Sequence, residues 1–293
     1  MIKNIDKWFI DYYSDTTGLA VEIEKILYHK KSRHQDVKII QTKDLGKVLL
    51  LDNFIYRSEW FGNIIPEMLT NVPMLTGNKK KKILLIGGGD GWTQNEILKY
   101  DFVERLDMVD IDEAVIEACK THFDPINKGF DDPRLNIHII DGKEFLEKSN
   151  EVYDLIIISA TAPFNADGTH SMAYRLYQKD FFELCKKRVS EDGIFIIDGS
   201  NVFYGSKDIA YSEISYITIM KQIEGIFPIT KIFNVISPLI PGGLFAMIIA
   251  SKKFDPESDI SIENLKFNTE FYNLDIHKSC FKLPNFMQKL LRG

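Results

Sequence analysis

Short apolar runs alternate with helix-like segments from residue 82 onward. The runs cover residues 82–88, 105–111, 135–141, 153–159, 193–199, 230–236 and 245–251, and helical periodicity marks residues 112–123 and 177–189 between them. Apolar runs of this length are typical of strands buried on both faces. Because strands that alternate with helices form parallel sheets, the pattern predicts an α/β fold with a mostly parallel, doubly wound sheet.

The first part of the chain follows a different pattern. Residues 19–56 alternate in short β-rich runs interrupted by turn residues, which predicts a small antiparallel sheet. Residues 60–75 are expected to form a helix whose regularity Pro66 limits. We therefore predict two domains, an N-terminal β domain over residues 1–78 and a Rossmann-like domain over residues 79–293.

Composition narrows the class of protein. The chain has 293 residues, of which 45% are hydrophobic and 27% charged, so it can bury a substantial core. A net charge of -6 argues against a nucleic-acid surface, and the basic run Lys79–Lys82 is interpreted as a solvated linker. Cys119, Cys185 and Cys280 lie far apart, which indicates neither a disulfide framework nor a metal site. With no signal peptide or membrane span evident, we expect a cytoplasmic protein that binds no membrane.

A glycine-rich turn follows the first strand of the predicted sheet and precedes a helix. In "ILLIGGGDGWTQNEILKY", Gly87, Gly88 and Gly89 let the backbone approach a ligand closely, and the next helix presents its amino end. The dinucleotide fingerprint would place its third glycine where Trp92 stands, which leaves less room for a pyrophosphate. The turn therefore favours a donor of the adenosylmethionine type, which needs no phosphate pocket.

Two aspartates end the next two strands. Asp110 comes about twenty residues after the turn, where a carboxylate can accept hydrogen bonds from both ribose hydroxyls. Asp141 ends the third strand and could accept a hydrogen bond from an adenine amino group. Together with the glycines they indicate an adenosyl ligand. The structural alternative is that both aspartates only cap the helices that follow them.

Several segments resemble a known family in order and spacing. The segments "LLIGGGDGWTQNEILKY", "VDIDEAVIEACKTHF", "DDPRLNIHIIDGKEFL" and "YDLIII", and also "WFID", "KSRHQDVKI", "GKVLLLDNFI" and "IPGGLFAMIIASKK", resemble the polyamine aminopropyltransferases, the spermidine synthase family. The resemblance implies an N-terminal β domain, a Rossmann-like domain, and a homodimer or homotetramer. It also implies decarboxylated adenosylmethionine as donor, bound by Gln35, Gly87, Gly88, Gly89, Asp90, Asp110, Ile111, Asp141, Gly142 and Ser159.

The resemblance fails at the strand end where the family carries out its chemistry. The family's Asp-Ser-x-Asp-Pro aligns with "SATAP", so Ser159 and Ala162 stand where both carboxylates are expected. An alkylamine with a pKa of about 10 is protonated at neutral pH and must lose a proton before it attacks. The family's hairpin glutamine is replaced by Tyr56, and its Tyr-(His or Gln) pair by Ile65 and Pro66. We therefore expect a retained donor site beside a rebuilt acceptor site.

Other residues could replace the missing groups. The candidates for catalysis are Ser159, Asp198 and Asp167, and those for binding the acceptor are Trp8, Tyr56 and Tyr177. Each has a structural alternative, because Asp198 could cap the next helix, Asp167 could be a solvated loop residue, and the aromatic residues could simply pack in the core.

Three functions remain open from the sequence. The first is transfer of an aminopropyl group to an amine or another nucleophile. The second is transfer of a methyl or amino-carboxypropyl group from intact adenosylmethionine, and the third is a binding protein without catalysis. Asp90 favours the first, because its carboxylate attracts the donor's ammonium. If it meets no compensating cation, the decarboxylated donor is expected to bind more tightly than the intact one. The glycine turn itself contains no Arg or Lys that could pair with the carboxylate of intact adenosylmethionine.

Overall fold

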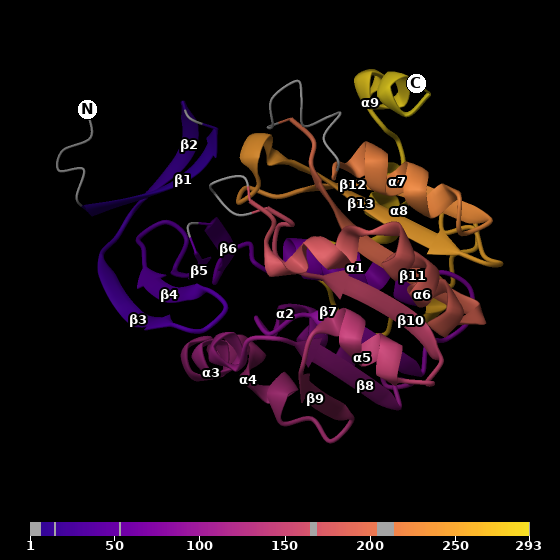
Figure 1. Cartoon of the computed structure of the whole chain (residues 1–293), viewed down its shortest axis with the longest axis horizontal. Helices are drawn as coiled ribbons and strands as arrows, with labels where there is room; N and C mark the ends of the chain where they lie inside the picture. The colour runs from indigo at the N-terminus through magenta and orange to yellow at the C-terminus, as the bar shows by residue number, and fades with distance from the viewer. Residues whose placement is uncertain (1–6, 15, 53, 165–168, 204–213, 293) are drawn as a thin grey trace.

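The computed structural model describes residues 7–14, 16–52, 54–164, 169–203 and 214–292. Its N-terminal part contains a two-stranded hairpin and a four-stranded antiparallel sheet, on the left of Figure 1. The strands are β1 (Trp8–Ser14) and β2 (Thr17–Glu22) in the hairpin, and β3 (Lys25–Lys31), β4 (Asp36–Gln41), β5 (Lys47–Leu51) and β6 (Phe54–Ser58) in the sheet. Strand structure thus begins earlier than predicted, because β1 pairs with β2 from Trp8 onward.

A seven-stranded sheet forms the centre of the molecule. In spatial order its strands are β12 (Ile229–Ile236), β13 (Leu244–Ser251), β11 (Val189–Asn201), β10 (Tyr153–Ser159), β7 (Lys82–Gly87), β8 (Arg105–Asp110) and β9 (Leu135–Ile139). The strands from β11 to β9 are parallel, and β13 runs antiparallel to both of its neighbours. The predicted α/β fold with a mostly parallel sheet is therefore confirmed.

Helices cover both faces of this sheet. Side chains alternate along β7, so that Ile83 and Leu85 pack in one core and Leu84 and Ile86 in another. The first core contains side chains of α1 (Ile64–Met74), α2 (Trp92–Leu98), α3 (Glu113–His122), α4 (Asp124–Phe130) and α8 (Leu274–Cys280). The second contains side chains of α5 (Gly142–Lys148), α6 (Lys179–Arg188), α7 (Tyr216–Glu224), α9 (Asn285–Arg292) and the 3-10 helix η2 (Met172–Tyr177). Two further 3-10 turns are η3 (Pro241–Gly243) and η4 (Ile262–Asn264).

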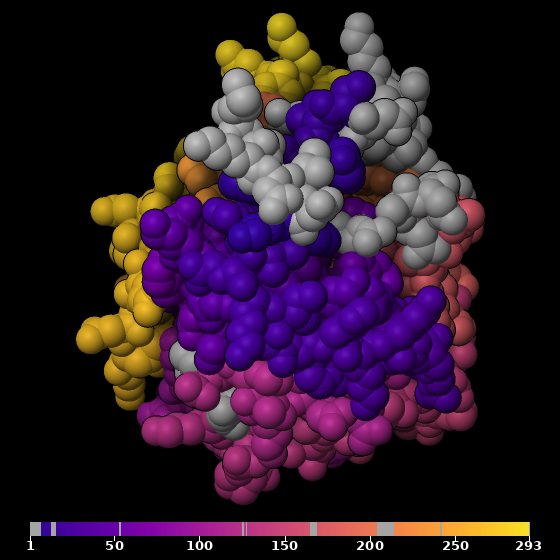
Figure 2. All heavy atoms as spheres, turned by 90° about the vertical axis from the view of Figure 1, so that its left-hand side faces the viewer, coloured from indigo at the N-terminus to yellow at the C-terminus, as the bar shows by residue number. Residues whose placement is uncertain are grey.

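The four-stranded sheet joins the first of these cores through one face. Ile39 and Leu49 are buried there, whereas Ile40 and Leu50, which point the other way, form a small separate cluster with the hairpin. In Figure 2 the indigo N-terminal strands spread across one face of the molecule. The sheet therefore lies against the carboxyl-end side of the Rossmann-like part, where its side chains can reach the site described below.

The order of the strands creates a crevice at β7. The chain leaves β7 towards β8 on one side, and β10 pairs with β7 on the other. Ligands of open α/β sheets bind at such a reversal, outside the carboxyl ends of the strands. Gly87 ends β7 with φ 81°, and a Cβ there would lie 2.0 Å from the carbonyl oxygen of Ser159. Only glycine permits the two strand ends to meet this closely.

Candidate functional site

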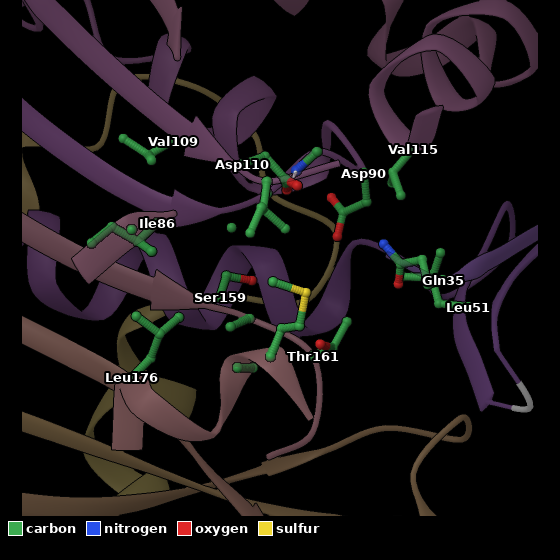
Figure 3. A pocket seen from close by; sticks show the side chains of 18 of the residues that line it. Gln35, Leu51, Ile86, Asp90, Val109, Asp110, Val115, Ser159, Thr161 and Leu176 are labelled. Atoms are coloured by element: carbon green, nitrogen blue, oxygen red, sulfur yellow. Dashed lines mark hydrogen bonds between the residues drawn. The ribbon is translucent and has the colours of Figure 1, made fainter. Parts of the chain in front are cut away.

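A pocket opens at this crevice, between the strand ends and the N-terminal sheet (Figure 3). Its lining comes from the glycine turn, the ends of β8 and β10, the start of α5, η2 and two strands of the N-terminal sheet. The residues are Gln35, Leu51, Tyr56, Ile86, Gly87, Gly88, Gly89, Asp90, Val109, Asp110, Ile111, Val115, Asp141, Gly142, Ser159, Ala160, Thr161, Met172, Ala173 and Leu176. The structure thus brings together all ten residues that the sequence assigned to the donor.

Asp110 is held by backbone N–H groups at the end of β8. Gly89 donates to its Oδ2 at 2.8 Å, and Asp112 donates to its Oδ1 at 2.9 Å. Burial raises the pKa of Asp110 to about 6, and these two hydrogen bonds oppose that rise. Asp110 does not cap α3, because the side chain that accepts from Ala114 at the start of that helix belongs to Asp112. The capping alternative is therefore wrong for Asp110.

Asp141 has both of the roles considered for it. It caps α5 by accepting from the backbone N–H of Glu144 at 2.9 Å, and it lines the pocket together with Gly142. The cap uses Oδ1, and Arg175 also lies 3.5 Å from that oxygen. Within the described residues Oδ2 of Asp141 takes no hydrogen bond, so it remains able to accept one from a ligand.

Gln35 reaches the pocket from the N-terminal sheet and is fixed there by Asp112. The amide nitrogen of Gln35 donates to Asp112 Oδ2 at 2.9 Å, and the Ser32 hydroxyl donates to the same oxygen at 2.7 Å. Asp112 thus connects the N-terminal sheet to the start of α3. Sequence reasoning missed this role, although the second carboxylate of "VDID" is a visible signal for it.

Asp90 lies fully buried in the glycine turn and has a cationic partner. The backbone N–H of Trp92 donates to Asp90 Oδ1 at 2.9 Å, and Arg57 Nε lies 3.2 Å from Asp90 Oδ2. Arg57 comes from β6 and is 5% exposed. The condition that Asp90 meets no compensating cation is therefore not fulfilled. No local pattern indicates this pair, because the two residues are brought together only by the packing of the N-terminal sheet.

The carboxyl end of β10 carries small side chains and is bordered by two tyrosines. Ser159 is the last residue of the strand, and its buried hydroxyl has no hydrogen-bond partner among the described residues. Tyr56 lines the pocket, and its hydroxyl donates to the carbonyl oxygen of Ser159 at 3.4 Å. Tyr177 is buried outside the pocket lining and donates to the carbonyl oxygen of Thr161 at 3.5 Å. Tyr177 therefore supports the strand end from behind.

Asp198 lies in β11, next to β10, just before an irregularity in the pairing with β13. Its Oδ1 is buried and accepts no hydrogen bond from the described residues. Burial raises the pKa of Asp198 to about 7; Arg57 lowers it and Asp90 raises it further. The residue that caps the next described helix, α7, is Ser215, so Asp198 does not cap it. Its unpaired carboxylate remains a candidate base.

Two sequence candidates stand apart from this cluster. Trp8 lies in β1, half-buried opposite Glu22, and does not line the pocket. Asp167 lies outside the described residues. Conversely, sequence reasoning missed η2, which contributes Met172, Ala173 and Leu176 to the lining. A 3-10 helix of six residues is too short to show a hydrophobic period that would reveal it.

Among the described residues, no group of three or more His, Cys, Asp or Glu side chains lies so that it could hold a metal ion. Cys119, Cys185 and Cys280 are all free and buried. None of the described helices is long and apolar enough to cross a membrane.

Comparison with known proteins gives consistent matches over nearly the whole chain. The spermine/spermidine synthase domain model matches residues 63–261, and the spermidine synthase tetramerisation domain model matches residues 7–59. A polyamine aminopropyltransferase of Thermotoga petrophila is 36% identical over 97% of this chain and 93% of its own length. One of Alkaliphilus oremlandii is 33% identical over 98% of both chains. A crystal structure of spermidine synthase with the transition state analogue AdoDATO superposes with a TM-score of 0.90 at 34% identity, covering 99% of this chain and 96% of that chain.

Proposed function

Because the chain belongs to the spermine/spermidine synthase family, we propose that it transfers an aminopropyl group from decarboxylated adenosylmethionine to an amine for which its acceptor site has been rebuilt. One observation carries this proposal. A donor pocket with every expected residue in place adjoins a strand end where Ser159 and Ala162 stand instead of carboxylates. We infer the transferase activity from the donor pocket, and the changed acceptor from the missing carboxylates at the strand end.

Three parts of the pocket would bind the ribose, the adenine and the sulfonium chain of an adenosyl donor. Asp110 would accept hydrogen bonds from the ribose hydroxyls, as an acidic residue does at the end of the second strand of such folds. Asp141 and the apolar side chain of Val109 would hold the adenine. The glycine turn leaves room for the sulfonium chain beside Asp90 and Gln35. In Figure 3 Asp90 is seen between Asp110 and Gln35, and Ser159 and Thr161 lie below these three residues in the view.

The reaction needs a neutral amine and a base. The amine's lone pair forms a bond to the carbon next to the sulfonium, and the carbon–sulfur bond breaks with its electrons going to sulfur. The donor thereby becomes methylthioadenosine. Asp198 would accept the proton that the amine releases, because its unpaired carboxylate with a pKa of about 7 is half ionised near neutral pH. The hydroxyl of Ser159 would position the amine through a hydrogen bond.

Arg57 favours a second candidate, transfer from intact adenosylmethionine. Its guanidinium could pair with the carboxylate of the intact donor. The glycine turn itself contains no cation that could form this pair. This candidate ranks lower because the pocket in which the donor would lie is lined by all ten residues expected for the decarboxylated donor.

Mass analysis of the reaction products tests the proposal against this alternative. The protein is incubated with each donor in turn and a panel of amines. Methylthioadenosine and an aminopropylated amine, formed only from the decarboxylated donor, are the expected products. Formation of adenosylhomocysteine, or consumption of the intact donor alone, would show that the second candidate is correct.

Asp110→Ala is expected to weaken binding of the decarboxylated donor about tenfold to a hundredfold, because a charged hydrogen-bond acceptor contributes roughly 1.5 to 3 kcal/mol. Calorimetric titration measures the change, and Asp101→Ala, at an exposed residue, is the matched control. Since the pKa of Asp110 is raised to about 6, native affinity should also fall as the pH drops below 6 and the carboxylate gains a proton. Unchanged titration curves for Asp110→Ala would contradict the placement of the ribose.

We further propose a homodimer or homotetramer built through the N-terminal strands. The tetramerisation domain model covers them, and Tyr12 and Ile26 expose 61% and 53% of their surface there. The two-domain division and the cytoplasmic location stay predictions.

A further inference from the structure

Arg57 is a buried cation with hydrogen-bonding capacity left over. Its Nε faces Asp90 at 3.2 Å, and its Nη1 donates to the carbonyl oxygen of Tyr56 at 3.2 Å. Its Nη2 has no partner among the described residues, although it is fully buried. The guanidinium lies over the ring of Tyr56, with 4.7 Å between its carbon and the ring centroid. A guanidinium offers five N–H donors, so Arg57 is both fixed in orientation and incompletely satisfied.

Unpaired acceptors surround the same region. Asp90 Oδ2 has only the ion pair with Arg57, and Asp198 Oδ1 and the Ser159 hydroxyl have no hydrogen-bond partner in the described part of the chain. Ser159 and Asp198 directly follow the paired residues Ile158 and Ile197 of the neighbouring strands β10 and β11, so they lie side by side. The charges of Arg57 and Asp90 both act on Asp198. Buried polar groups are nearly always paired, so donors and acceptors left open together indicate a ligand.

The buried carboxylate of Glu67 is already used by the fold. Glu67 of α1 accepts from the backbone N–H groups of Glu270, Phe271 and Tyr272 at 2.8 to 2.9 Å. It therefore cannot serve as an extra anion for a doubly positive amine. The free groups of the cluster are one cation, Arg57, and the two carboxylates of Asp90 and Asp198.

This balance of charge does not suit a diamine. Arg57 already pairs with one oxygen of Asp90. An ammonium group of a diamine would therefore be repelled by Arg57 or would compete with it for the same carboxylate. A ligand with one amino group and one carboxylate matches the open groups, since its amine can approach Asp198 and its carboxylate can accept from Arg57 Nη2. Arginine is also the side chain best suited to bind a carboxylate through two parallel hydrogen bonds.

We therefore propose that the acceptor is an amino acid, with a carboxylate that Arg57 binds and an amino group that receives the aminopropyl chain. This inference rests on the proposed function and specifies its acceptor. Tyr56 and Ser159 connect the two halves of the site, because both line the donor pocket while the Tyr56 ring lies against Arg57. The carboxylate is unchanged in the reaction, and Asp198 takes the proton from the attacking nitrogen.

Binding is tested by calorimetry with the full-length protein saturated with methylthioadenosine, so that no turnover is required. The ligands are amino acids of increasing chain length, from β-alanine to γ-aminobutyrate and ornithine. Each is compared with the amine of the same length that lacks the carboxylate, and butylamine and putrescine complete the panel. At least one amino acid is expected to bind tenfold or more tightly than its matched amine.

Variants assign this preference to Arg57. Arg57→Gln should weaken binding of the preferred amino acid about tenfold to a hundredfold and leave the matched amine nearly unchanged. Arg57→Lys should recover only part of the loss, because an ammonium lacks the planar fork. Since Arg57→Gln leaves Asp90 buried without a partner, the pair Arg57→Gln plus Asp90→Asn serves as a second variant that removes both charges. Arg292→Gln, at an exposed residue of α9, is the control.

Three results would overturn the inference. Putrescine or butylamine could bind as tightly as any amino acid to the native protein. Arg57→Gln and the double variant could both keep the native preference. Loss of Arg57 could instead weaken intact adenosylmethionine selectively, which would assign the carboxylate to the donor. None of these depends on turnover, whereas failure of the proposed function would appear as donor binding without methylthioadenosine release for any amine.

Discussion

Replacing Asp198 with asparagine should lower turnover about a hundredfold to ten-thousandfold, the usual contribution of a general base. In the native protein the pKa of Asp198 is raised to about 7 by burial, so kcat/KM should rise with pH up to about 7 and then level. Below that pH the carboxyl group is protonated and cannot accept a proton from the amine. The variant should lose this dependence, which initial rates across a pH series would show.

Thermal unfolding separates this effect from damage to the fold. The pKa of Asp198 is higher in the folded protein than the value of 3.8 that applies to an unperturbed aspartate. The folded state therefore binds the proton more tightly, and the native protein loses stability as the pH rises from about 4 to about 7. Asparagine carries no charge, so Asp198→Asn should lack this loss and melt at least as high as the native protein at pH 8. A variant that keeps native turnover would show that Asp198 is not the base.

The double variant Ser159→Asp plus Ala162→Asp should gain activity with putrescine by about tenfold to a hundredfold. The carboxylate added at the buried position 159 restores one contact to a dication, worth roughly 1 to 3 kcal/mol, and the one added at the exposed position 162 contributes less. Ala162 is exposed and can accept the larger side chain, whereas the Ser159 side chain is enclosed beside Tyr56. The gain should therefore stop short of an efficient enzyme, because Arg57, Tyr56 and Pro66 still shape the site against a diamine.

The matched control is Ser159→Asn plus Ala162→Asn, which has similar volume and no added charge. Steady-state rates of spermidine formation compare the two proteins. Equal rates in both would mean that the strand end does not limit the use of putrescine.

The fold and the donor half of the site could be read from the sequence because their signals are local. Strand β10 coincides with the predicted range, since an apolar run with a turn at its end defines a buried strand without tertiary information. The glycine turn and Asp110 also occur at the carboxyl ends of predicted strands. The order of such strands brings their carboxyl ends together, so the site follows from the pattern.

The proposed acceptor half could not be predicted in this way, because its contacts join distant parts of the chain. Arg57 and Asp90 come from different sheets and meet only when the N-terminal sheet packs on the strand ends. Helix α1 begins at Ile64, later than the predicted residue 60, and Pro66 lies in its first turn, where the missing N–H is tolerated. Hydrophobic periodicity predicts neither the Arg57–Asp90 pair nor the first residue of α1.

The most direct measurement is the rate at which the native protein forms spermidine from putrescine when the decarboxylated donor is saturating. Donor binding should be tight by calorimetry, while spermidine should form slowly or not at all, far below the roughly 1 to 10 per second of an ordinary enzyme. Tight donor binding with slow transfer would support a retained donor site beside a rebuilt acceptor site. Turnover with putrescine at roughly 1 to 10 per second would contradict it and show that the site without the two carboxylates is still a spermidine synthase.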